Sequence, residues 1–368
     1  MNVIRLHLPG GDAAAAADRS YDIVCGQGIL DSLGERIREA GAGRAVVIAD
    51  AAVAGSHATR TASGLLAAGI DAPVLTVPSG EASKCLAEAG RLWDAFADRA
   101  VDRRTHVVAV GGGVVGDLAG FVAATFARGL PIWHAPTTLV SQVDSAIGGK
   151  TGINLHGGKN LVGVFWQPSG VIADIDTLAT LPEREFVSGL AEVVKYGMIL
   201  DPDFFAWLEE NADSLVRRDP AALGRAVSRS VALKAWVVEQ DERETTGLRA
   251  VLNYGHTFAH AYETVAGYGT LLHGEAVAIG MAQAARLAAR LNRIPDATVA
   301  RQDRLLAAMK LPTVPPDALR DSRGLIAVMA RDKKSVNGRL RFVLPSRVGH
   351  VDLVDAIDEA VVRAVLER

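Results

Sequence analysis

The sequence predicts an α/β domain with a parallel sheet, followed by a mostly α-helical domain. Three observations predict it. In the first half, short β-branched runs alternate with helix-length segments, which is typical of a parallel sheet with crossover helices. From Glu183 onward strand patterns become rare and long helix-forming windows follow. The 368 residues also exceed the roughly 250–300 that one core usually accommodates. We therefore expect two domains, residues 1–180 and 181–368.

The individual elements follow from local patterns. Apolar, β-branched runs predict strands at 44–49, 74–77, 106–110 and 131–135. Helix-forming windows predict helices at 221–242, 251–265, 275–291 and 297–309. Prolines between 312 and 316 indicate a loop, and 339–344 is expected to form one late strand.

Composition limits the classes of function. Hydrophobic residues make up 49% and charged residues 22% of the chain, as in soluble globular proteins. With 39 basic and 42 acidic residues, the net charge of −3 gives no broad basic surface for nucleic acid or anionic lipid. The longest apolar stretch, 107–127, is interrupted by five glycines and Asp117, so it does not predict a membrane span. We expect small-molecule ligands, no nucleic acid and no membrane.

The cysteines and the N-terminal residues indicate where in the cell the protein is expected. Cys25 and Cys85 lie in no metal-ligand spacing and cannot form a disulfide framework. The first residues do not form a charged segment followed by an apolar one, as a secretory signal would. A cytoplasmic location is the expectation.

A glycine-rich turn follows the strand expected at 106–110. Gly111, Gly113 and Gly116 have the G-x-G-x-x-G spacing and open an expected helix. Glycines allow the backbone to approach a pyrophosphate, and a helix N-terminus stabilises its negative charge. No acid stands about 20 residues further on to bind a ribose, so a plain strand-to-helix turn stays open as an alternative.

The stretch from Arg128 to Pro168 is rich in glycines, hydroxyls and lysines. Glycines beside Lys150 and Lys159 suit the binding of phosphate or carboxylate by amides and ammonium groups. The alternative is a solvated glycine-rich loop with two surface lysines.

The second half contains a metal-ligand pattern. His256 and His260 lie four residues apart on one helix face, and His273 lies 17 residues beyond His256, where another helix should begin. Glu192 is a carboxylate flanked by apolar residues. One carboxylate, two imidazoles and an open position form a catalytic zinc pattern. Spacing leaves open whether His260 or His273 is the second nitrogen ligand, and the missing HExxH motif disfavours a zincin protease.

Seven motifs in order resemble the 3-dehydroquinate synthase family, and the resemblance covers nearly the whole chain. They lie at 79–84, 111–117, 136–160, 189–197, 252–258, 272–278 and 331–334. The family implies an N-terminal NAD-binding α/β domain, a helical C-terminal domain with zinc or cobalt, and an active site in the cleft between them. It also implies a homodimer.

The resemblance implies the ligands of both cofactors. The metal ligands would be Glu192, His256 and His273, with His260 in the active site or in contact with a ligand. NAD would be held by Asp50, Ser79, Gly80, Glu81, Lys84, Gly113, Val114, Val115, Gly116, Asp117, Thr137, Thr138, Lys150, Lys159, Thr177, Leu178 and Thr180. Glu81 would then supply the ribose-binding acid that the glycine motif lacks.

The resemblance also implies the substrate-binding and catalytic residues. They would be Arg128, Asp144, Lys150, Lys159, Asn160, Lys195, Lys234, Arg249, Asn253 and His260, with one of Lys333 and Lys334. The implied substrate, 3-deoxy-D-arabino-heptulosonate 7-phosphate, carries a carboxylate and a phosphate, so several cations are needed to orient it.

The implied reaction is the lyase step of the shikimate pathway that leads to chorismate and the aromatic amino acids. NAD oxidises the C5 carbinol, phosphate is eliminated from the acidified neighbouring carbon, and NADH returns the hydride. Ring opening and an intramolecular aldol closure yield 3-dehydroquinate, so NAD acts catalytically. The metal would polarise the C5 oxygen.

Three other readings remain. A sedoheptulose 7-phosphate cyclase that makes valiolone-type products shares the scaffold, but the stretch 144–154 follows the dehydroquinate synthase form. A metal-dependent polyol dehydrogenase would release NADH stoichiometrically and would not need Lys150, Lys159 and Lys195. A catalytically inactive homologue could act as a binding or scaffold protein.

Overall fold

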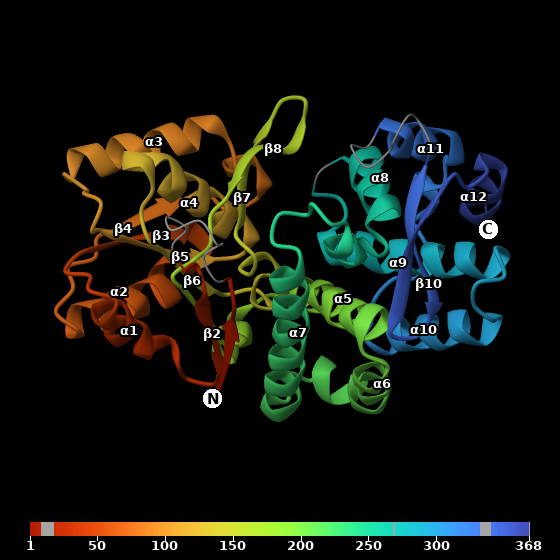
Figure 1. Ribbon diagram of the computed structural model, residues 1–368, viewed down its shortest axis with the longest axis horizontal. Helices are drawn as coiled ribbons and strands as arrows, with labels where there is room; N and C mark the ends of the chain where they lie inside the picture. Colours follow the sequence, from red (N-terminus) through yellow and green to blue (C-terminus); the bar gives the residue numbers. More distant parts are fainter. Residues whose placement is uncertain (9–17, 268, 332–339, 368) are drawn as a thin grey trace. The chain divides into compact units, whose positions relative to one another are not determined.

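The structure is a computed structural model that describes residues 1–8, 18–267, 269–331 and 340–367. Two compact units are present (Figure 1). Unit 1 comprises Met1–Leu181 and Gly224–Arg243, and unit 2 comprises Pro182–Leu223 and Glu244–Arg368. No helix in the described ranges is both long and apolar enough to cross a membrane.

Unit 1 is built on a seven-stranded sheet in the order β1-β2-β9-β6-β5-β3-β4. All neighbouring strands pair in parallel except β1, which is antiparallel to β2. The strands are β1 (Asn2–Leu6), β2 (Tyr21–Gly26), β3 (Ala45–Asp50), β4 (Val74–Val77), β5 (His106–Gly111), β6 (Ile132–Pro136) and β9 (Gly170–Asp174). The four strands expected from the sequence are confirmed, whereas β1, β2 and β9 were not predicted.

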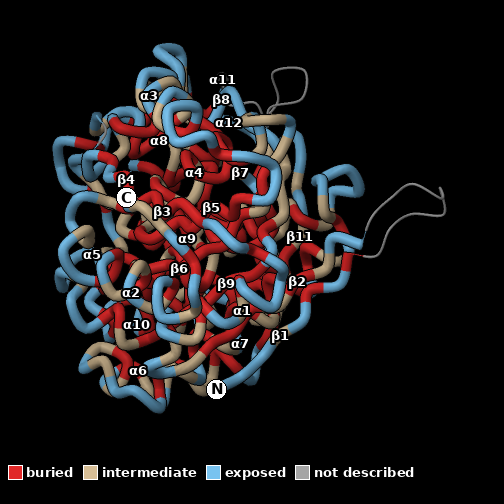
Figure 2. The backbone as a smooth tube through the Cα atoms, turned by 90° about the vertical axis from the view of Figure 1, so that its left-hand side faces the viewer, coloured by how far each residue is buried: buried red, intermediate tan, exposed pale blue. Residues whose placement is uncertain are grey.

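Helices cover both faces of this sheet (Figure 1). Alternate side chains of β3 and β5 point to opposite faces, since side chains alternate along a strand. One set packs against α3 (Leu86–Asp98) and α4 (Gly113–Thr125), and the other packs against α1 (Leu33–Glu39) and α2 (Thr59–Ala67). The central strands are therefore buried on both sides, as Figure 2 shows for β3, β5 and β6. This is the doubly wound fold that the sequence predicts.

Two further elements belong to unit 1. A hairpin of β7 (Lys150–Leu155) and β8 (Gly158–Phe165) forms in the glycine-rich stretch for which a solvated loop was the alternative interpretation. Most of α7 (Pro220–Gln240) is grouped with unit 1, although the sequence placed it in the helical domain. Its side chains reach the sheet's first strand: Ser228 accepts a hydrogen bond from Asn2 at 3.0 Å.

Unit 2 is mostly helical. Its helices are α5 (Glu183–Leu200), α6 (Pro202–Val216), α8 (His256–Ala266), α9 (His273–Arg290), α10 (Asp296–Ala308), α11 (Ser322–Arg331) and α12 (Glu359–Leu366). The expected late strand is β10 (Arg341–Arg347), which pairs with the unpredicted β11 (His350–Asp355). The helix expected at 251–265 begins only at His256, after a short 3-10 turn, Leu248–Asn253.

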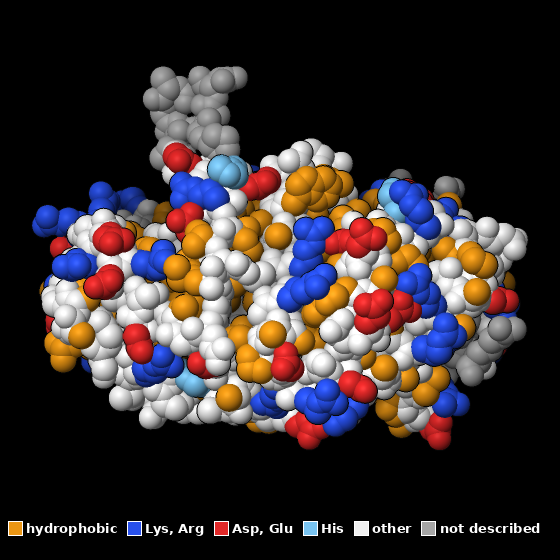
Figure 3. Space-filling model, turned by 90° about the horizontal axis from the view of Figure 1, so that it is seen from below, with side chains coloured by type: hydrophobic (Ala, Val, Ile, Leu, Met, Phe, Trp, Pro, Cys, Tyr) orange, Lys and Arg blue, Asp and Glu red, His pale blue; other side chains and the backbone are white. Residues whose placement is uncertain are grey.

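Charges of both signs are mixed on the surface. On the face drawn in Figure 3, lysine and arginine side chains are interspersed with aspartate and glutamate. This face therefore presents no continuous basic surface of the kind that nucleic acid requires.

Candidate active site

Three side chains from three helices of unit 2 form a group that could hold a metal ion. Glu192 lies in α5, His256 begins α8 and His273 begins α9. One ligand atom from each lies within 4.8 Å of the others. Glu192 Oε1 is 3.7 Å from His256 Nε2 and 3.5 Å from His273 Nε2. A carboxylate and two imidazoles are a common donor set for zinc with open coordination positions.

Glycines allow these helices to approach closely enough. A Cβ atom at Gly274 would lie 1.8 Å from the carbonyl oxygen of Ser188, so α9 can lie against α5 only with glycine there. Gly255, just before α8, has a φ of 78° and touches α9, where a Cβ would lie 2.8 Å from the Met281 amide nitrogen. His256 and His273 therefore both stand at helix starts that are held against a neighbouring helix.

The electrostatics of this group favour a cation. Burial acts to raise the pKa of Glu192, but Lys195 and the two histidines outweigh burial and hold that pKa well below its usual range. Burial acts to lower the pKa of His273, but the carboxylates of Glu192 and Glu263 outweigh it and raise that pKa to about 9. Burial and the nearby Lys195 keep the pKa of His256 well below its usual value. Two carboxylates thus stabilise positive charge where the imidazoles meet.

The residues present fit a divalent metal ion. Glu192 is fully buried; Lys195 forms an ion pair with its Oε2, and its Oε1 faces the two imidazoles. His256 Nδ1 lies 3.1 Å from the carbonyl oxygen of Tyr254, which leaves Nε2 as the ligand atom. Glu263 Oε1 lies 3.7 Å from His273 Nδ1. Outer carboxylates and carbonyls of this kind orient metal-binding imidazoles.

Of the other residues expected in residues 181–368, His260, Arg249, Asn253 and Lys195 lie in unit 2, whereas Lys234 belongs to the part of α7 that is grouped with unit 1. The ring centroid of His260 is 5.7 Å from that of His256, but His260 is not part of the three-residue group. Arg249 and Asn253 lie in the turn that precedes α8, and Arg249 is 1% exposed. Lys333 and Lys334 lie outside the described residues.

In unit 1, several expected residues meet at the carboxyl ends of the parallel strands. Asp50 ends β3, Gly111 ends β5 and Pro136 ends β6. A Cβ atom at Gly113 would lie 2.9 Å from Ser145 Oγ, and one at Gly112 would lie 3.0 Å from Thr138 Cγ2. Any larger residue at Gly112 or Gly113 would therefore collide with Thr138 or Ser145.

The glycine turn also presents hydrogen-bond donors. The first intrahelical bond of α4 runs from the Gly116 amide to the Gly112 carbonyl oxygen at 3.1 Å. The amides of Gly113, Val114 and Val115 therefore have no partner inside the helix. Amides at a helix start are suited to a phosphate group, so the turn fits the pyrophosphate of a dinucleotide.

Polar side chains around this turn are held by one another. Lys84, which is 4% exposed, forms an ion pair with Asp117 of α4. Burial raises the pKa of Asp117, and Lys84 opposes that rise. Ser79, which precedes Gly80 with its φ of 97°, donates a hydrogen bond to the Asp50 carboxylate.

The hairpin is anchored to the same edge of unit 1. Asn154 in β7 donates to Glu81 Oε1 at 2.8 Å, and its amide donates to the Lys84 carbonyl oxygen at 2.8 Å. The Asn160 amide donates to Asn154 Oδ1 at 2.9 Å. Lys150 begins β7 and Lys159 lies in β8, so both expected anion-binding lysines are on a strand pair and not on an open loop.

A contact between distant parts of the sequence joins Lys234 of α7 to Asp144. Lys234 forms an ion pair with the Asp144 carboxylate and donates to its carbonyl oxygen at 2.7 Å. The expected residue Arg128 is exposed and has a left-handed backbone, with φ 70°. Thr137 is buried, and its amide donates to the Gly111 carbonyl oxygen at 2.9 Å.

Sequence reasoning did not identify Gln142 and Glu263. The fully buried Gln142 amide donates to the carbonyl oxygens of Pro136 at 3.2 Å and Asp174 at 2.8 Å, which joins β6 to β9. No local pattern marks it. Glu263 lies seven residues after His256 in the same helix. This spacing of two turns puts both residues on one helix face, and it could have identified Glu263 as a residue near the metal group.

Comparisons with known proteins cover nearly the whole chain. Residues 74–188 match the family model described as 3-dehydroquinate synthase N-terminal, and residues 189–335 match its C-terminal counterpart. A 3-dehydroquinate synthase of Rhodopirellula baltica is 50% identical over 357 residues, covering 95% of each chain.

Two solved structures of cyclases are also similar. A 2-deoxy-scyllo-inosose synthase, complexed with carbaglucose-6-phosphate, NAD+ and Co2+, matches with 28% identity and a TM-score of 0.87 over 99% of both chains. A 2-epi-5-epi-valiolone synthase from Streptomyces hygroscopicus, with NAD+ and Zn2+ bound, matches with 28% identity and a TM-score of 0.86, covering 94% of this chain and 95% of that one. The family models and the curated relative agree: the chain belongs to the 3-dehydroquinate synthase family.

Proposed function

We propose that the protein converts 3-deoxy-D-arabino-heptulosonate 7-phosphate into 3-dehydroquinate and phosphate. The observation that carries the proposal is the group of Glu192, His256 and His273, whose ligand atoms lie within 4.8 Å of one another. Identity to a curated 3-dehydroquinate synthase is 50%, against 28% to the solved valiolone-type and inosose-type cyclases, which favours this substrate over theirs.

The proposal assigns one cofactor to each unit. Glu192, His256 and His273 of unit 2 would hold a zinc or cobalt ion, and the glycine turn of unit 1, with Asp50, Glu81 and Lys84, would hold NAD. Bound together, these cofactors would supply a transient oxidation and re-reduction of a substrate carbinol and a Lewis acid for its oxygen. The two similar cyclases carry NAD+ with Zn2+ or Co2+ in their solved structures, which supports both assignments.

The chain's own cations would bind and orient a substrate that carries a carboxylate and a phosphate. Lys195 and Arg249 of unit 2 are each 1% exposed, so their positive charges lie where water screens them least. In unit 1, the ion pair with Asp144 holds Lys234 in one orientation. Arg128, Lys150 and Lys159 supply further positive charge. These residues would hold both ends of the substrate during elimination and ring closure.

The proposal also includes an enzyme class, an oligomeric state and a cellular location. The reaction makes the protein a carbon–oxygen lyase that eliminates phosphate. A homodimer and a cytoplasmic location accompany this function in our proposal. Size-exclusion chromatography with light scattering tests the dimer, and a monomer at working concentration would exclude it.

The direct test measures phosphate release and the carbocyclic product together. The enzyme is given the seven-carbon keto acid phosphate, catalytic NAD and added zinc or cobalt. We expect phosphate and 3-dehydroquinate in equal amounts, without accumulation of NADH. If the enzyme cyclises only sedoheptulose 7-phosphate, the substrate assignment is wrong. Stoichiometric formation of NADH would indicate a dehydrogenase. NAD binding without turnover of either substrate would indicate an inactive homologue.

A further inference from the structure

The short helical segment η7 (Ile175–Thr180) follows β9 and carries three residues, Thr177, Leu178 and Thr180, that the family resemblance implies at the NAD site. Two of them are buried: Thr177 is 2% exposed and Leu178 is 0% exposed. The Thr177 hydroxyl donates to the Asp174 carbonyl oxygen at 2.7 Å and lies 3.1 Å from the Gln142 amide nitrogen that donates to it. The Thr177 side chain therefore holds the backbone of η7 in place and offers no surface to a ligand.

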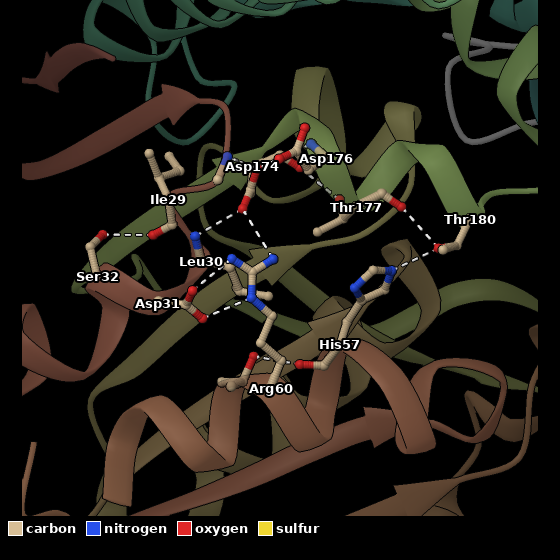
Figure 4. A network of polar contacts seen from close by, with 12 residues as sticks. Ile29, Leu30, Asp31, Ser32, His57, Arg60, Asp174, Asp176, Thr177 and Thr180 are labelled. Carbon is tan, nitrogen blue, oxygen red and sulfur yellow. Dashed lines mark hydrogen bonds and ion pairs between the residues drawn. The ribbon is translucent and has the colours of Figure 1, made fainter. Parts of the chain in front are cut away.

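The third residue, Thr180, is also committed to the protein. Its hydroxyl donates to the Thr177 carbonyl oxygen at 3.1 Å. A hydroxyl has one hydrogen, so its oxygen can only accept from its other neighbour, His57 Nε2, at 2.7 Å. Figure 4 shows the His57 ring directed at Thr180 from outside η7.

His57 is suited to a fixed donor role. It lies in the segment η3 (Ala54–Ala58) that leads into α2, and it is 8% exposed. Burial and the nearby Arg60 lower the pKa of His57, so the ring is neutral near pH 7 and has a single N–H. The Thr180 contact requires this hydrogen on Nε2. The Thr61 hydroxyl donates to the His57 carbonyl oxygen at 2.8 Å and fixes the backbone that carries the ring.

The start of η7 is held independently of His57. The fully buried Asp174 carboxylate accepts from the amides of Gly28 at 2.8 Å, Leu30 at 2.9 Å and Asp176 at 3.1 Å (Figure 4). Asp174 therefore anchors one end of η7, and the His57–Thr180 contact anchors the other. Removal of His57 would free only the second end.

We propose that His57 is a positioning residue for NAD binding: its Nε2–H holds the Thr180 hydroxyl and, through it, the Thr177 carbonyl, so that η7 presents a fixed backbone to the dinucleotide. The inference rests on the proposed function, because it takes unit 1 as the NAD-binding part. It adds a residue that none of the family motifs identified above contains.

The test compares His57→Ala with His57→Gln in the full-length chain. The Kd for NAD is measured by calorimetry, and KM for NAD and kcat are measured in the phosphate-release assay. We expect His57→Ala to weaken NAD binding about tenfold, the effect of losing roughly one partly buried hydrogen bond, with kcat at saturating NAD within about twofold of wild type. His57→Gln, which keeps an N–H donor at a similar reach, should recover most of the affinity.

A double mutant and a matched control complete the design. Thr180→Ala should weaken NAD binding as His57→Ala does, and the double variant should bind no worse than either single variant, because both remove one contact. His106→Ala removes another buried histidine of unit 1, which accepts from Trp133 Nε1 at 3.0 Å at the amino end of β5. It should lower the melting temperature and leave the Kd for NAD unchanged.

The outcomes separate this inference from the proposed function. Wild-type affinity in His57→Ala, equal losses in His57→Ala and His106→Ala, or additive losses in the double variant would each overturn it. A wild-type chain that binds no NAD would overturn it as well. If wild type binds NAD, His57→Ala binds it tenfold more weakly and neither turns over the sugar acid phosphate, the positioning role stands and the proposed function fails.

Discussion

The two candidate sites are built in opposite ways. In unit 2, three side chains from three helices, two buried and the His273 side chain partly exposed, point at one place, and their charges converge on Glu192. In unit 1, the glycine turn presents backbone amides, while the charged groups around it are paired with one another, as in Lys84–Asp117 and Lys234–Asp144. The first arrangement suits a small ion that needs fixed donors, and the second suits an extended anion bound by many backbone groups.

The comparison predicts that the largest single effect lies in unit 2. His273→Ala removes one of three metal donors, so we expect the bound zinc or cobalt to be lost on dialysis and turnover to fall more than about 100-fold. Metal content is measured by plasma mass spectrometry beside the activity. His350→Ala, a partly exposed histidine of the same unit, is the control. Full metal content in His273→Ala would exclude it as a ligand.

The close approach of α5 and α9 gives the next effect. Gly274→Ala places a Cβ atom 1.8 Å from the Ser188 carbonyl oxygen, so the helices must separate. We expect a loss of about 3 kcal/mol in the free energy of unfolding, with weaker metal binding and unchanged NAD affinity. Gly90→Ala in α3 meets no atom within 4 Å and should stabilise by about 0.5–1 kcal/mol. A fully stable Gly274→Ala variant with normal metal affinity would contradict the packing argument.

The sheet of unit 1 should be sensitive to acid through His134. Burial lowers the pKa of His134 from 6.5 to about 4. The folded state therefore binds fewer protons than the unfolded chain, so this contribution to stability is fully present above pH 6.5 and is lost as the pH falls toward 4. Between pH 6.5 and pH 5, His134 should lower the free energy of unfolding of the wild-type protein by about 2 kcal/mol, and His134→Leu should not show this decrease. Urea unfolding followed by tryptophan fluorescence measures it, and an unchanged slope against pH would refute it.

The smallest effect is expected at the glycine turn. Gly113→Ala places a Cβ atom 2.9 Å from Ser145 Oγ and narrows the space beside the first amides of α4. Many backbone groups share the binding of a dinucleotide, so we expect the Kd for NAD to rise only about tenfold, with unchanged metal content. Calorimetry measures the Kd, with Gly90→Ala again as the control. Loss of metal in Gly113→Ala would show that the two sites are not separable in the way the comparison assumes.

Local patterns in the sequence were sufficient for much of the fold and of the site. The strands β3 to β6 are short apolar runs, and α4 and α9 begin where the sequence predicts, at Gly113 and His273. These features depend on residues close in the chain, so periodicity and turn chemistry identify them. The strands β1, β2 and β9, with five or six residues each, are no shorter than the predicted β4 with its four, so their length does not explain why they were not predicted.

Which histidines join Glu192 in the metal group depends on how the helices pack. The residue spacing left His260 and His273 as alternatives, and only the family resemblance favoured His273, because helix spacing says which residues share a face and not which face meets Glu192. The approach of α9 to α5 at Gly274 brings in His273, and His260 lies beside His256 outside the group.

The sequence by itself determined the alternation of strands and helices, the glycine turn and the family to which the chain is similar. Only the tertiary structure placed α7 with unit 1, which pairs Lys234 with Asp144 across 90 positions, and joined His57 to Thr180 across 123. The physical reason is that burial along one element follows from its own residues, whereas a contact between distant elements depends on how whole faces pack together.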